Sequence, residues 1–377
     1  MIPFNKPYVT GLEQDYLEQA VRSGRLSGNG IMTRSVCNRL QNITGASNVL
    51  LTTSCSTALD MAAILSGVGH GDEVIVPSFT FPSTANAFVQ RGAVPVFADS
   101  TDLHPNVSAD TIAHLITERT SVIVVTHYAG VPCNMDAINR LAGQHNILVV
   151  EDAAMALGST FNNKPVGSLS PLTAFSFHET KVLGCGEGGA LALQRSDLMS
   201  RAEIIWEKGT NRAAFQRGQS DHYEWVDIGS SFLPSEIQAA WLMAQLKEAE
   251  SILNKRAEQW NRYYLSFQHV LPDGFALPVI PENVHHNGSI FYVQCPDRQV
   301  RNYLINALQR AGIMAVFHYL PLHSSKMGQK WRSDKTCNQA EKWSDTLVRL
   351  PLYHTLSVQD QQFIIDQVVL ACRHSVN

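Results

Sequence analysis

Five apolar segments of the chain are each followed at once by polar, aromatic or cationic residues. Lys181 comes after the segment Thr173–Phe177, and Asp152 comes after Ile147–Glu151. The residues that follow the other three segments are Ser54–Thr57, Ser78–Phe81 and His127–Tyr128. If the segments are parallel strands of one sheet, their carboxyl ends meet at the edge where α/β proteins bind ligands. The sequence therefore predicts one site that contains an amine, a carboxylate, hydroxyl groups and an aromatic ring.

These groups match the four parts that a protein supplies for chemistry with pyridoxal 5′-phosphate (PLP). An amine forms a Schiff base with the cofactor aldehyde and later moves a proton. A carboxylate keeps the pyridine nitrogen protonated, so that the ring withdraws electrons. Backbone N–H groups at the start of a helix bind the phosphate, and a flat apolar surface holds the ring. Lys181, Asp152, Ser54–Thr57 and Phe81 would supply these parts in turn.

The first two-thirds of the chain alternates short apolar runs with amphipathic stretches. Strands are predicted at Asn48–Thr52, Glu73–Pro77, Val94–Ala98, Val122–His127, Ile147–Glu151, Thr173–Phe177 and Ala190–Leu193. Helices are predicted at Ser56–Ser66, Pro82–Arg91, Ala109–Thr117 and Met135–His145. Several strands are continuous in Val, Ile and Leu, which suits strands that are buried on both faces. The alternation predicts a layered α/β domain.

The pattern changes after about residue 240, where a long polar helix is predicted. That helix, Ala240–Phe267, precedes two strands and two further helices, which are predicted at Ile290–Cys295, Ile313–Tyr319, Gln299–Ala311 and Gln359–Arg373. A chain of 377 residues is too long for one small core. We therefore expect a large α/β domain over residues 1–245 and a small α+β domain over residues 246–377.

The composition excludes several classes of protein. With 45% hydrophobic and 16% charged residues the chain has an ordinary globular composition. The net charge of −4 is small and no block of like charge occurs, which disfavours nucleic acid and membrane surfaces as partners. The N-terminal residues do not form a signal peptide, and no apolar run is long enough to span a membrane. The seven cysteines are scattered and form no C-x-x-C pair, so a cytoplasmic enzyme without a metal is expected.

Three sequence motifs occur in the order that one enzyme family shows. They are Phe175–Lys181 followed by Gly186–Gly189, Glu151–Ala154, and Pro77–Phe81 followed by Thr84–Asn86. They resemble the lysine, pyridine-nitrogen and ring-stacking motifs of the DegT/DnrJ/EryC1/StrS aminotransferases, and the resemblance extends from Pro3 to the C-terminal helix. It implies the PLP-dependent transferase fold type I, which is aspartate aminotransferase-like. That fold has a large mixed seven-stranded sheet domain and a small C-terminal α+β domain.

The resemblance also implies a role for individual residues. Lys181 matches the Schiff-base lysine, and Asp152 matches the carboxylate that binds the pyridine nitrogen. Phe81 occupies the position of the aromatic ring over the cofactor, and Ser176 occupies that of a phosphate-binding hydroxyl. Met155 stands where most members have a Gln or His that binds the ring hydroxyl, and a thioether is only a weak acceptor.

Three further positions imply phosphate contacts and a dimer. Cys55 and Ser56 align with a Gly-Thr pair whose backbone reaches the phosphate. Ser231 aligns with an asparagine that many members of the family donate to the phosphate of the partner subunit. The resemblance thus implies a homodimer whose active sites are shared across the interface.

Four segments narrow the expected substrates. They are Met1–Asn5, Glu207–Arg212, Asp227–Ser231 and Met314–Tyr319. They are most similar to members of the family that transfer an amino group from L-glutamate to dTDP-4-keto-6-deoxy-D-glucose. The product of those enzymes is dTDP-4-amino-4,6-dideoxy-D-galactose, which is used for cell-surface polysaccharides such as enterobacterial common antigen or O-antigen.

His318, Tyr319 and His323 follow a predicted strand of the small domain. They are candidates to face the sugar or the carboxylates of glutamate, and the alternative is ordinary packing. Together with His127 they show no close spacing of the kind that metal ligands have, so no metal site is expected.

Simpler interpretations exist for each residue taken alone. A lone lysine after a strand is usually a solvated surface residue, and Asp152 could cap a helix. The run Gly184–Gly189 superficially suggests a dinucleotide-binding loop, but it leads into the strand Ala190–Leu193 instead of opening a helix. Two alternatives stay open for the whole chain. One is another nucleotide-keto-sugar aminotransferase with a different sugar or stereochemistry, and the other is a non-catalytic PLP-fold binding protein.

Overall fold

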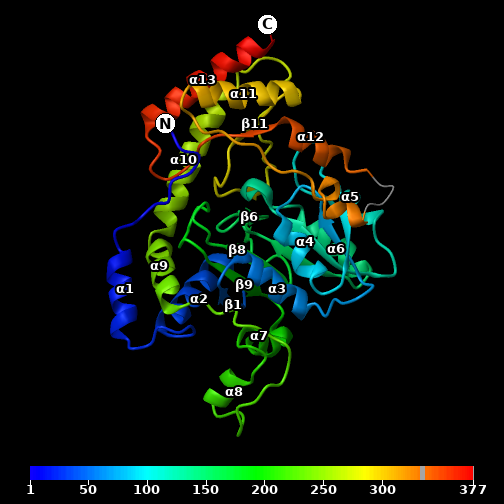
Figure 1. The fold of residues 1–377 in the computed structure, drawn as a ribbon, viewed down its shortest axis with the longest axis vertical. Coiled ribbons are helices and arrows are strands. Elements are labelled where there is room, and N and C mark those ends of the chain that lie inside the picture. Colours follow the sequence, from blue (N-terminus) through cyan, green and yellow to red (C-terminus); the bar gives the residue numbers. More distant parts are fainter. Residues whose placement is uncertain (332–335, 377) are drawn as a thin grey trace.

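A mixed seven-stranded sheet forms the centre of the larger part of the molecule (Figure 1). The computed structural model describes residues 1–331 and 336–376. The strand order is β1-β9-β8-β5-β4-β2-β3, and β9 is antiparallel to both of its neighbours while the other pairs are parallel. The bounds are β1 (Asn48–Thr52), β2 (Glu73–Pro77), β3 (Val94–Ala98), β4 (Thr120–Thr126), β5 (Leu148–Asp152), β8 (Leu172–Ser176) and β9 (Gly189–Leu193). All seven predicted strands are confirmed, and β1, β2 and β3 have the predicted bounds.

The apolar strands are continuous because both faces of the sheet are covered. In β2, Val74 and Val76 pack into one core cluster, whereas Ile75 between them packs into the cluster on the opposite face. In β4, Val122 and Val124 alternate in the same way with Ile123. Successive side chains of a strand point to opposite faces, so a strand with two buried faces needs apolar residues at every position.

The helices that follow the strands begin close to the predicted residues. They are α3 (Cys55–Leu65), α4 (Pro82–Val89), α5 (Ala109–Ala113) and α6 (Met135–Gln144). Ser54 caps α3 in a reciprocal arrangement with Thr57, and Pro82 occupies the first turn of α4. Helix α5 is shorter than predicted, because after Ala113 the backbone N–H groups of Leu115 and Ile116 donate to carbonyls only three residues back.

The predicted long helix is two helices, which form a column along one side of the molecule (Figure 1). They are α9 (Glu236–Lys247) and α10 (Ala249–Phe267), separated at Glu248, whose ψ of 13° departs from the helical value. Helices α1 (Glu13–Arg22) and α2 (Ile31–Thr44), which were not predicted, pack against α9. The buried carboxylate of Glu236 accepts hydrogen bonds from the backbone N–H groups of Gly30 (3.0 Å), Met32 (2.7 Å) and Thr33 (3.0 Å). Glu236, on a helix far along the chain, thereby accepts hydrogen bonds from N–H groups at the start of α2 that have no partner within that helix.

A smaller two-stranded sheet lies at the other end of α10. It consists of β11 (Tyr292–Gln294) and β12 (Leu347–Arg349), and α11 (Arg298–Arg310), α12 (Asn338–Thr346) and α13 (Val358–Val376) surround it. The strand predicted at Ile313–Tyr319 is wrong, since that segment forms only isolated bridges, Ile2 to Ile313 and Val316 to Arg349. Its backbone groups are divided between two different partners, so no continuous ladder forms. The division of the chain into two domains at residue 245 stays a prediction.

The remaining elements are short and peripheral. A three-stranded sheet is formed by β6 (Thr160–Phe161), β7 (Lys164–Pro165) and β10 (Val284–His285). Helices α7 (Met199–Trp206) and α8 (Arg212–Gln216) lead into a projecting lobe at the bottom of Figure 1. None of the described helices is long and apolar enough to cross a membrane.

Replacing Glu236 by Ala should lower the free energy of unfolding by about 3 kcal/mol, because buried N–H groups of α2 would lose their acceptor. Urea denaturation followed by circular dichroism measures this. The matched control is Glu18→Ala, which removes an exposed ion pair with Arg22 (2.6 Å) and should change stability by no more than about 0.5 kcal/mol. Equal effects of the two substitutions would contradict the capping role of Glu236.

Candidate active site

A cavity of about 480 Å³ lies at the carboxyl ends of β4, β5 and β8 and at the first turns of α3 and α4. Its size is within the range of small-molecule sites. Most of its wall is formed by Ser54, Cys55, Ser56, Thr80, Phe81, Ser83, Thr126, Asp152, Met155, Ser176, Lys181, His318, Tyr319 and Arg349. The residues predicted to follow the strands therefore converge on one cavity.

Two of the predicted site residues do not line this cavity. The side chain of His323 lies outside the cavity and is hydrogen bonded there, with Nδ1 at 2.6 Å from the Ser78 hydroxyl and Nε2 at 3.2 Å from Glu341. Ser231 is exposed and forms an isolated bridge with Glu207 in the segment that follows the lobe of α8. Contact of Ser231 with a partner subunit stays a prediction.

Asp152 ends β5 at the floor of the cavity and is only 4% exposed. Its Oδ2 accepts a hydrogen bond of 2.6 Å from the hydroxyl of Thr84, and its Oδ1 accepts one of 3.1 Å from the N–H of Ala154. The Thr84 hydroxyl is itself linked to Thr80 at 2.9 Å, and Thr80 is linked to Thr126 at 2.9 Å. This chain of hydroxyl groups fixes the plane of the carboxylate.

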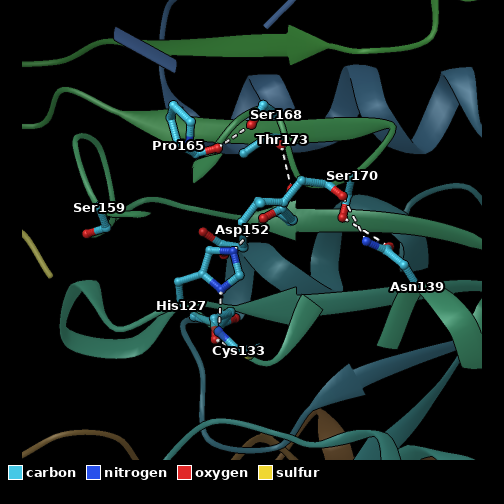
Figure 2. A network of polar contacts seen from close by, with 12 residues as sticks. His127, Cys133, Asn139, Asp152, Ser159, Pro165, Ser168, Ser170 and Thr173 are labelled. Carbon is cyan, nitrogen blue, oxygen red and sulfur yellow. Dashed lines mark hydrogen bonds and ion pairs between the residues drawn. The ribbon is translucent and has the colours of Figure 1, made fainter. Parts of the chain in front are cut away.

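The residues behind Asp152 are held by a second, fully buried network (Figure 2). Glu151 accepts hydrogen bonds from the ring of His127 at 2.6 Å and from the hydroxyl of Thr173 at 2.9 Å. The other ring nitrogen of His127 accepts from the N–H of Cys133 at 3.2 Å, so the proton on Nε2 points to Glu151. The N–H of His127 also donates to the carbonyl of Asp152 at 3.2 Å. The floor of the cavity is thereby tied to two neighbouring strands.

Lys181 comes from the short loop after β8 and faces the cavity. The loop is closed by backbone hydrogen bonds from Lys181 to His178 (2.9 Å) and from Cys185 to Phe177 (2.8 Å). Burial lowers the pKa of Lys181, while Cys55 and Asp152 oppose that shift and Arg349 adds to it. Within the described part of the chain its Nζ makes no hydrogen bond or salt bridge. Lys181 is therefore a largely desolvated amine with a free Nζ.

The start of α3 lies beside Ser176 because Gly189 allows a close approach. Gly189 pairs with Ser176 on one side and with Thr52 on the other. A side chain on Gly189 would place its Cβ at 2.4 Å from the N of Cys55, so only glycine fits there. The first N–H groups of a helix have no partner within the helix, and those of α3 begin with Cys55 and Ser56. The result is a group of N–H and hydroxyl donors that suits an anion.

Phe81 and Met155 complete the wall on its apolar side. Phe81 precedes the first turn of α4, and 57% of its surface is exposed, so an aromatic face is available to a flat ligand. Met155 is 7% exposed and packs with Phe79, Tyr128 and Ile290. Met155 therefore offers packing but no hydrogen-bond donor to a ligand.

Arg349 and Phe4 are site residues that no local sequence pattern indicated, and Tyr128 lies behind them against His318. Arg349 and Phe4 line the cavity, although they lie at opposite ends of the chain. The guanidinium of Arg349 lies over the ring of Phe4 at 4.5 Å from its centroid. Tyr128 follows β4, as predicted, and its hydroxyl lies 3.2 Å from Nδ1 of His318. Arg349 was missed because it is positioned by β12, which was not predicted.

The arrangement fits PLP. A buried carboxylate, a free amine, a group of anion-binding donors and an exposed aromatic face border the same cavity. Asp152 would hold the pyridine nitrogen, Phe81 the ring, and Cys55, Ser56 and Ser176 the phosphate. No group of His, Cys, Asp and Glu suitable for a metal ion occurs among the described residues.

Comparison with known proteins identifies the family. The model of the DegT/DnrJ/EryC1/StrS aminotransferase family matches residues 7–369. The chain is 31% identical to the spore coat polysaccharide biosynthesis protein SpsC of Bacillus subtilis (strain 168), and the match covers 97% of this chain and 96% of SpsC. The chain therefore belongs to the DegT/DnrJ/EryC1/StrS aminotransferase family and is a PLP-dependent aminotransferase.

Solved structures agree over the full length. Spr1654 from Streptococcus pneumoniae, assigned as a sugar aminotransferase, superposes with a TM-score of 0.92 at 26% identity, covering 99% of this chain and 100% of that one. DesV of S. venezuelae, in complex with a ketimine intermediate, superposes with a TM-score of 0.89 at 27% identity, covering 98% of each chain. The expected fold type I is thereby confirmed.

Replacing Asp152 by Asn should weaken PLP binding and lower amino transfer by at least about 100-fold, because the neutral amide cannot keep the pyridine nitrogen protonated. The variant should still fold, since the amide oxygen of Asn still accepts the hydrogen bond from Thr84. PLP titration by absorbance and a transamination assay measure the two effects. The control is Asp136→Asn, a carboxylate in the exposed first turn of α6 that is bonded to Asn162 and does not line the cavity. Full activity of the Asp152 variant would refute the assignment.

Replacing Met155 by Gln should raise the affinity for PLP about fivefold, because the amide can donate to the ring hydroxyl and such a bond contributes about 1 kcal/mol. Without PLP the same variant should be less stable, because the amide is then buried without a partner. Equilibrium titration and thermal melts with and without PLP test both effects. Met155→Leu, which adds no polar group, is the control, and equal PLP affinities of the two variants would count against this role for the position.

Proposed function

We propose that this aminotransferase moves an amino group from L-glutamate to the 4-keto carbon of dTDP-4-keto-6-deoxy-D-glucose. The product would be dTDP-4-amino-4,6-dideoxy-D-galactose, made in the cytoplasm for cell-surface polysaccharide such as enterobacterial common antigen or O-antigen. One observation carries the transaminase part of the proposal. The desolvated, free amine of Lys181 borders the same cavity as the buried carboxylate of Asp152.

PLP, when bound, supplies a conjugated ring that accepts the electrons released at the reacting carbon. The protein has to place that ring and control the protons around it. Asp152 places a negative charge at the cavity floor, and its two hydrogen bonds prevent it from rotating. Phe81 and the first turn of α3 would define the ring plane and the phosphate position.

Lys181 has two duties in the proposed reaction. In the resting enzyme it would hold the cofactor through its aldehyde, and once free it would move protons. Because burial lowers its pKa, a larger fraction of the amine is neutral than in water and can act as a base. Lys181 would take the proton from Cα of glutamate and later deliver a proton to C4 of the sugar. The face from which it delivers that proton decides between an axial and an equatorial amine.

The sugar part of the proposal is supported by sequence and by relatives. The segments Glu207–Arg212 and Asp227–Ser231 are similar to members that use dTDP-4-keto-6-deoxyglucose. SpsC is a polysaccharide biosynthesis protein by name, and Spr1654 is assigned to sugar chemistry. Another nucleotide-linked keto-sugar with a different stereochemical outcome is the alternative within this family, and non-catalytic binding is the alternative outside it.

A homodimer with shared active sites is part of the proposal. The lobe that contains α8 exposes Phe215 (44%), Tyr223 (54%) and Trp225 (78%). Aromatic residues of this size are common where subunits meet. Ser231 follows the same lobe, and the family resemblance implies that it contacts the phosphate site of the partner subunit. We also retain the division into domains of residues 1–245 and 246–377.

The test is amino transfer from glutamate to a panel of dTDP-, UDP- and GDP-linked keto-sugars, with product configuration determined by NMR. We expect turnover of dTDP-4-keto-6-deoxyglucose and a galactose-configured product. Lys181→Ala should lower transfer by at least about 1,000-fold and abolish the visible absorbance of the attached cofactor. Lys164→Ala, an exposed lysine of β7, is the control. No turnover of this sugar would refute the specific substrate, and a Lys181 variant with unchanged spectrum and activity would refute the mechanism.

A further inference from the structure

The geometry points to Arg349 as the residue that binds the α-carboxylate of the amino donor. The assignment rests on the proposed function, because it needs an amino acid as one of the two substrates. It adds a donor subsite on the side of the cavity formed by β12, the N-terminal segment and the residues that follow Val316.

Arg349 is held firmly by its backbone. It is the last residue of β12, where it pairs with Tyr292 of β11. On its other edge, its N–H donates to the carbonyl of Val316 at 2.7 Å and its carbonyl accepts from the Val316 N–H at 3.2 Å. With hydrogen-bonded neighbours on both sides, Arg349 presents its side chain to the cavity from a fixed position.

The hydrogen bonds of the guanidinium are incomplete. Nη1 donates to the ring of His318, whereas Nε is buried and has no hydrogen-bond partner among the described residues. Nη2 makes no hydrogen bond, and no carboxylate forms a salt bridge with Arg349, among residues 1–331 and 336–376. Nε and Nη2 form one edge of the planar fork, which is the edge that binds both oxygens of a carboxylate. Nη2 is thus the donor that an anion in the cavity can reach first, and Nε beside it has a hydrogen bond still to offer.

The surroundings of Arg349 do not supply the missing charge. Burial lowers the pKa of Arg349, and the hydroxyl groups of Tyr128 and Tyr319 only partly oppose this. Phe4 stacks on the cation but offers no net negative charge. A buried cation without a counter-ion is costly, so an anion that enters the cavity would be bound strongly.

His318 orients the fork. Because arginine only donates, Nε2 of His318 must accept, and Nδ1 then carries the proton that is donated to Tyr128. The ring also stacks on Tyr319 with centroids 3.9 Å apart. Burial lowers the pKa of His318, followed by the charges of Arg349 and Lys181, so the ring stays neutral and does not compete for the anion. His318 is thus a positioning residue for Arg349.

The chemistry of the substrates selects the α-carboxylate. It is bonded directly to the carbon whose proton Lys181 would remove, and Arg349 lies close enough to Lys181 for the two charges to affect each other. The diphosphate of the sugar nucleotide is separated from C4 by the sugar ring and the glycosidic oxygen. The cofactor phosphate has its own donors at α3. The α-carboxylate is the anion that must sit nearest to Lys181.

The test separates the two half-reactions. PLP-loaded wild type, Arg349→Gln and Arg349→Lys are mixed with glutamate, and the loss of PLP absorbance gives the apparent Kd for glutamate. We expect Arg349→Gln to raise that Kd by about 100-fold, and Arg349→Lys to restore part of the affinity. The same variants loaded with pyridoxamine phosphate are then given the keto-sugar, and the effect there should be at least about 30-fold smaller than on the glutamate half. Arg195→Gln, a surface arginine paired with Asp197, is the matched control.

Competition experiments identify the carboxylate. Alanine keeps the α-carboxylate and lacks the distal one, whereas 4-aminobutyrate keeps only the distal one. Arg349→Gln should weaken competition by alanine and leave that by 4-aminobutyrate unchanged. The reverse pattern, or a larger effect on the sugar half, would overturn the assignment. The assignment would also be overturned if the wild type reacts with glutamate and Arg349→Gln has the same apparent Kd for glutamate. A wild type that fails with glutamate would instead refute the proposed function.

Discussion

The cavity holds charged side chains that are largely removed from water, and none of them forms a salt bridge within residues 1–331 and 336–376. Asp152 is hydrogen bonded only to a hydroxyl and a backbone N–H, and neither Lys181 nor Arg349 forms a salt bridge within the described residues. Paired charges would neutralise one another and would leave nothing to bind a cofactor or a substrate. The uncompensated state destabilises the protein locally, so the surrounding structure has to be rigid enough to maintain it.

That rigidity comes from strands whose ends are fixed on both sides. Asp152 lies on β5 between β4 and β8, and its carboxylate is oriented by a chain of three hydroxyl groups from the start of α4 and the end of β4. Gly189 brings Ser176 and the start of α3 together by removing a side chain. Glu236 stabilises α2 from α9, at a distance from the cavity. The core interactions thus supply the stability that the charged cavity lacks.

The sequence predicted those parts of the site that depend on local pattern. The strands were recognised because two buried faces require unbroken apolar runs, and Lys181 and Asp152 were recognised because they follow such runs. Features that depend on contacts between residues far apart in the chain have no such local pattern and were not predicted. The break at Glu248 interrupts a stretch whose composition is helical on both sides, and the segment Ile313–Tyr319 alternates like a strand but pairs with two different partners. Arg349 lies in the short strand β12, whose pairing with β11 could not be read from its own residues.

One cavity has to accept two substrates of different charge in turn. In the proposed reaction glutamate would bring an α-carboxylate close to Lys181, whereas the sugar would bring hydroxyl groups to the same place. A buried arginine that was stable only with an anion would leave its position when the sugar entered. Phe4 stacks on the guanidinium and His318 accepts from it whichever substrate is present. In the sugar half-reaction these two contacts would therefore keep the guanidinium in place. In the donor half-reaction they would leave Nη2 available to a carboxylate.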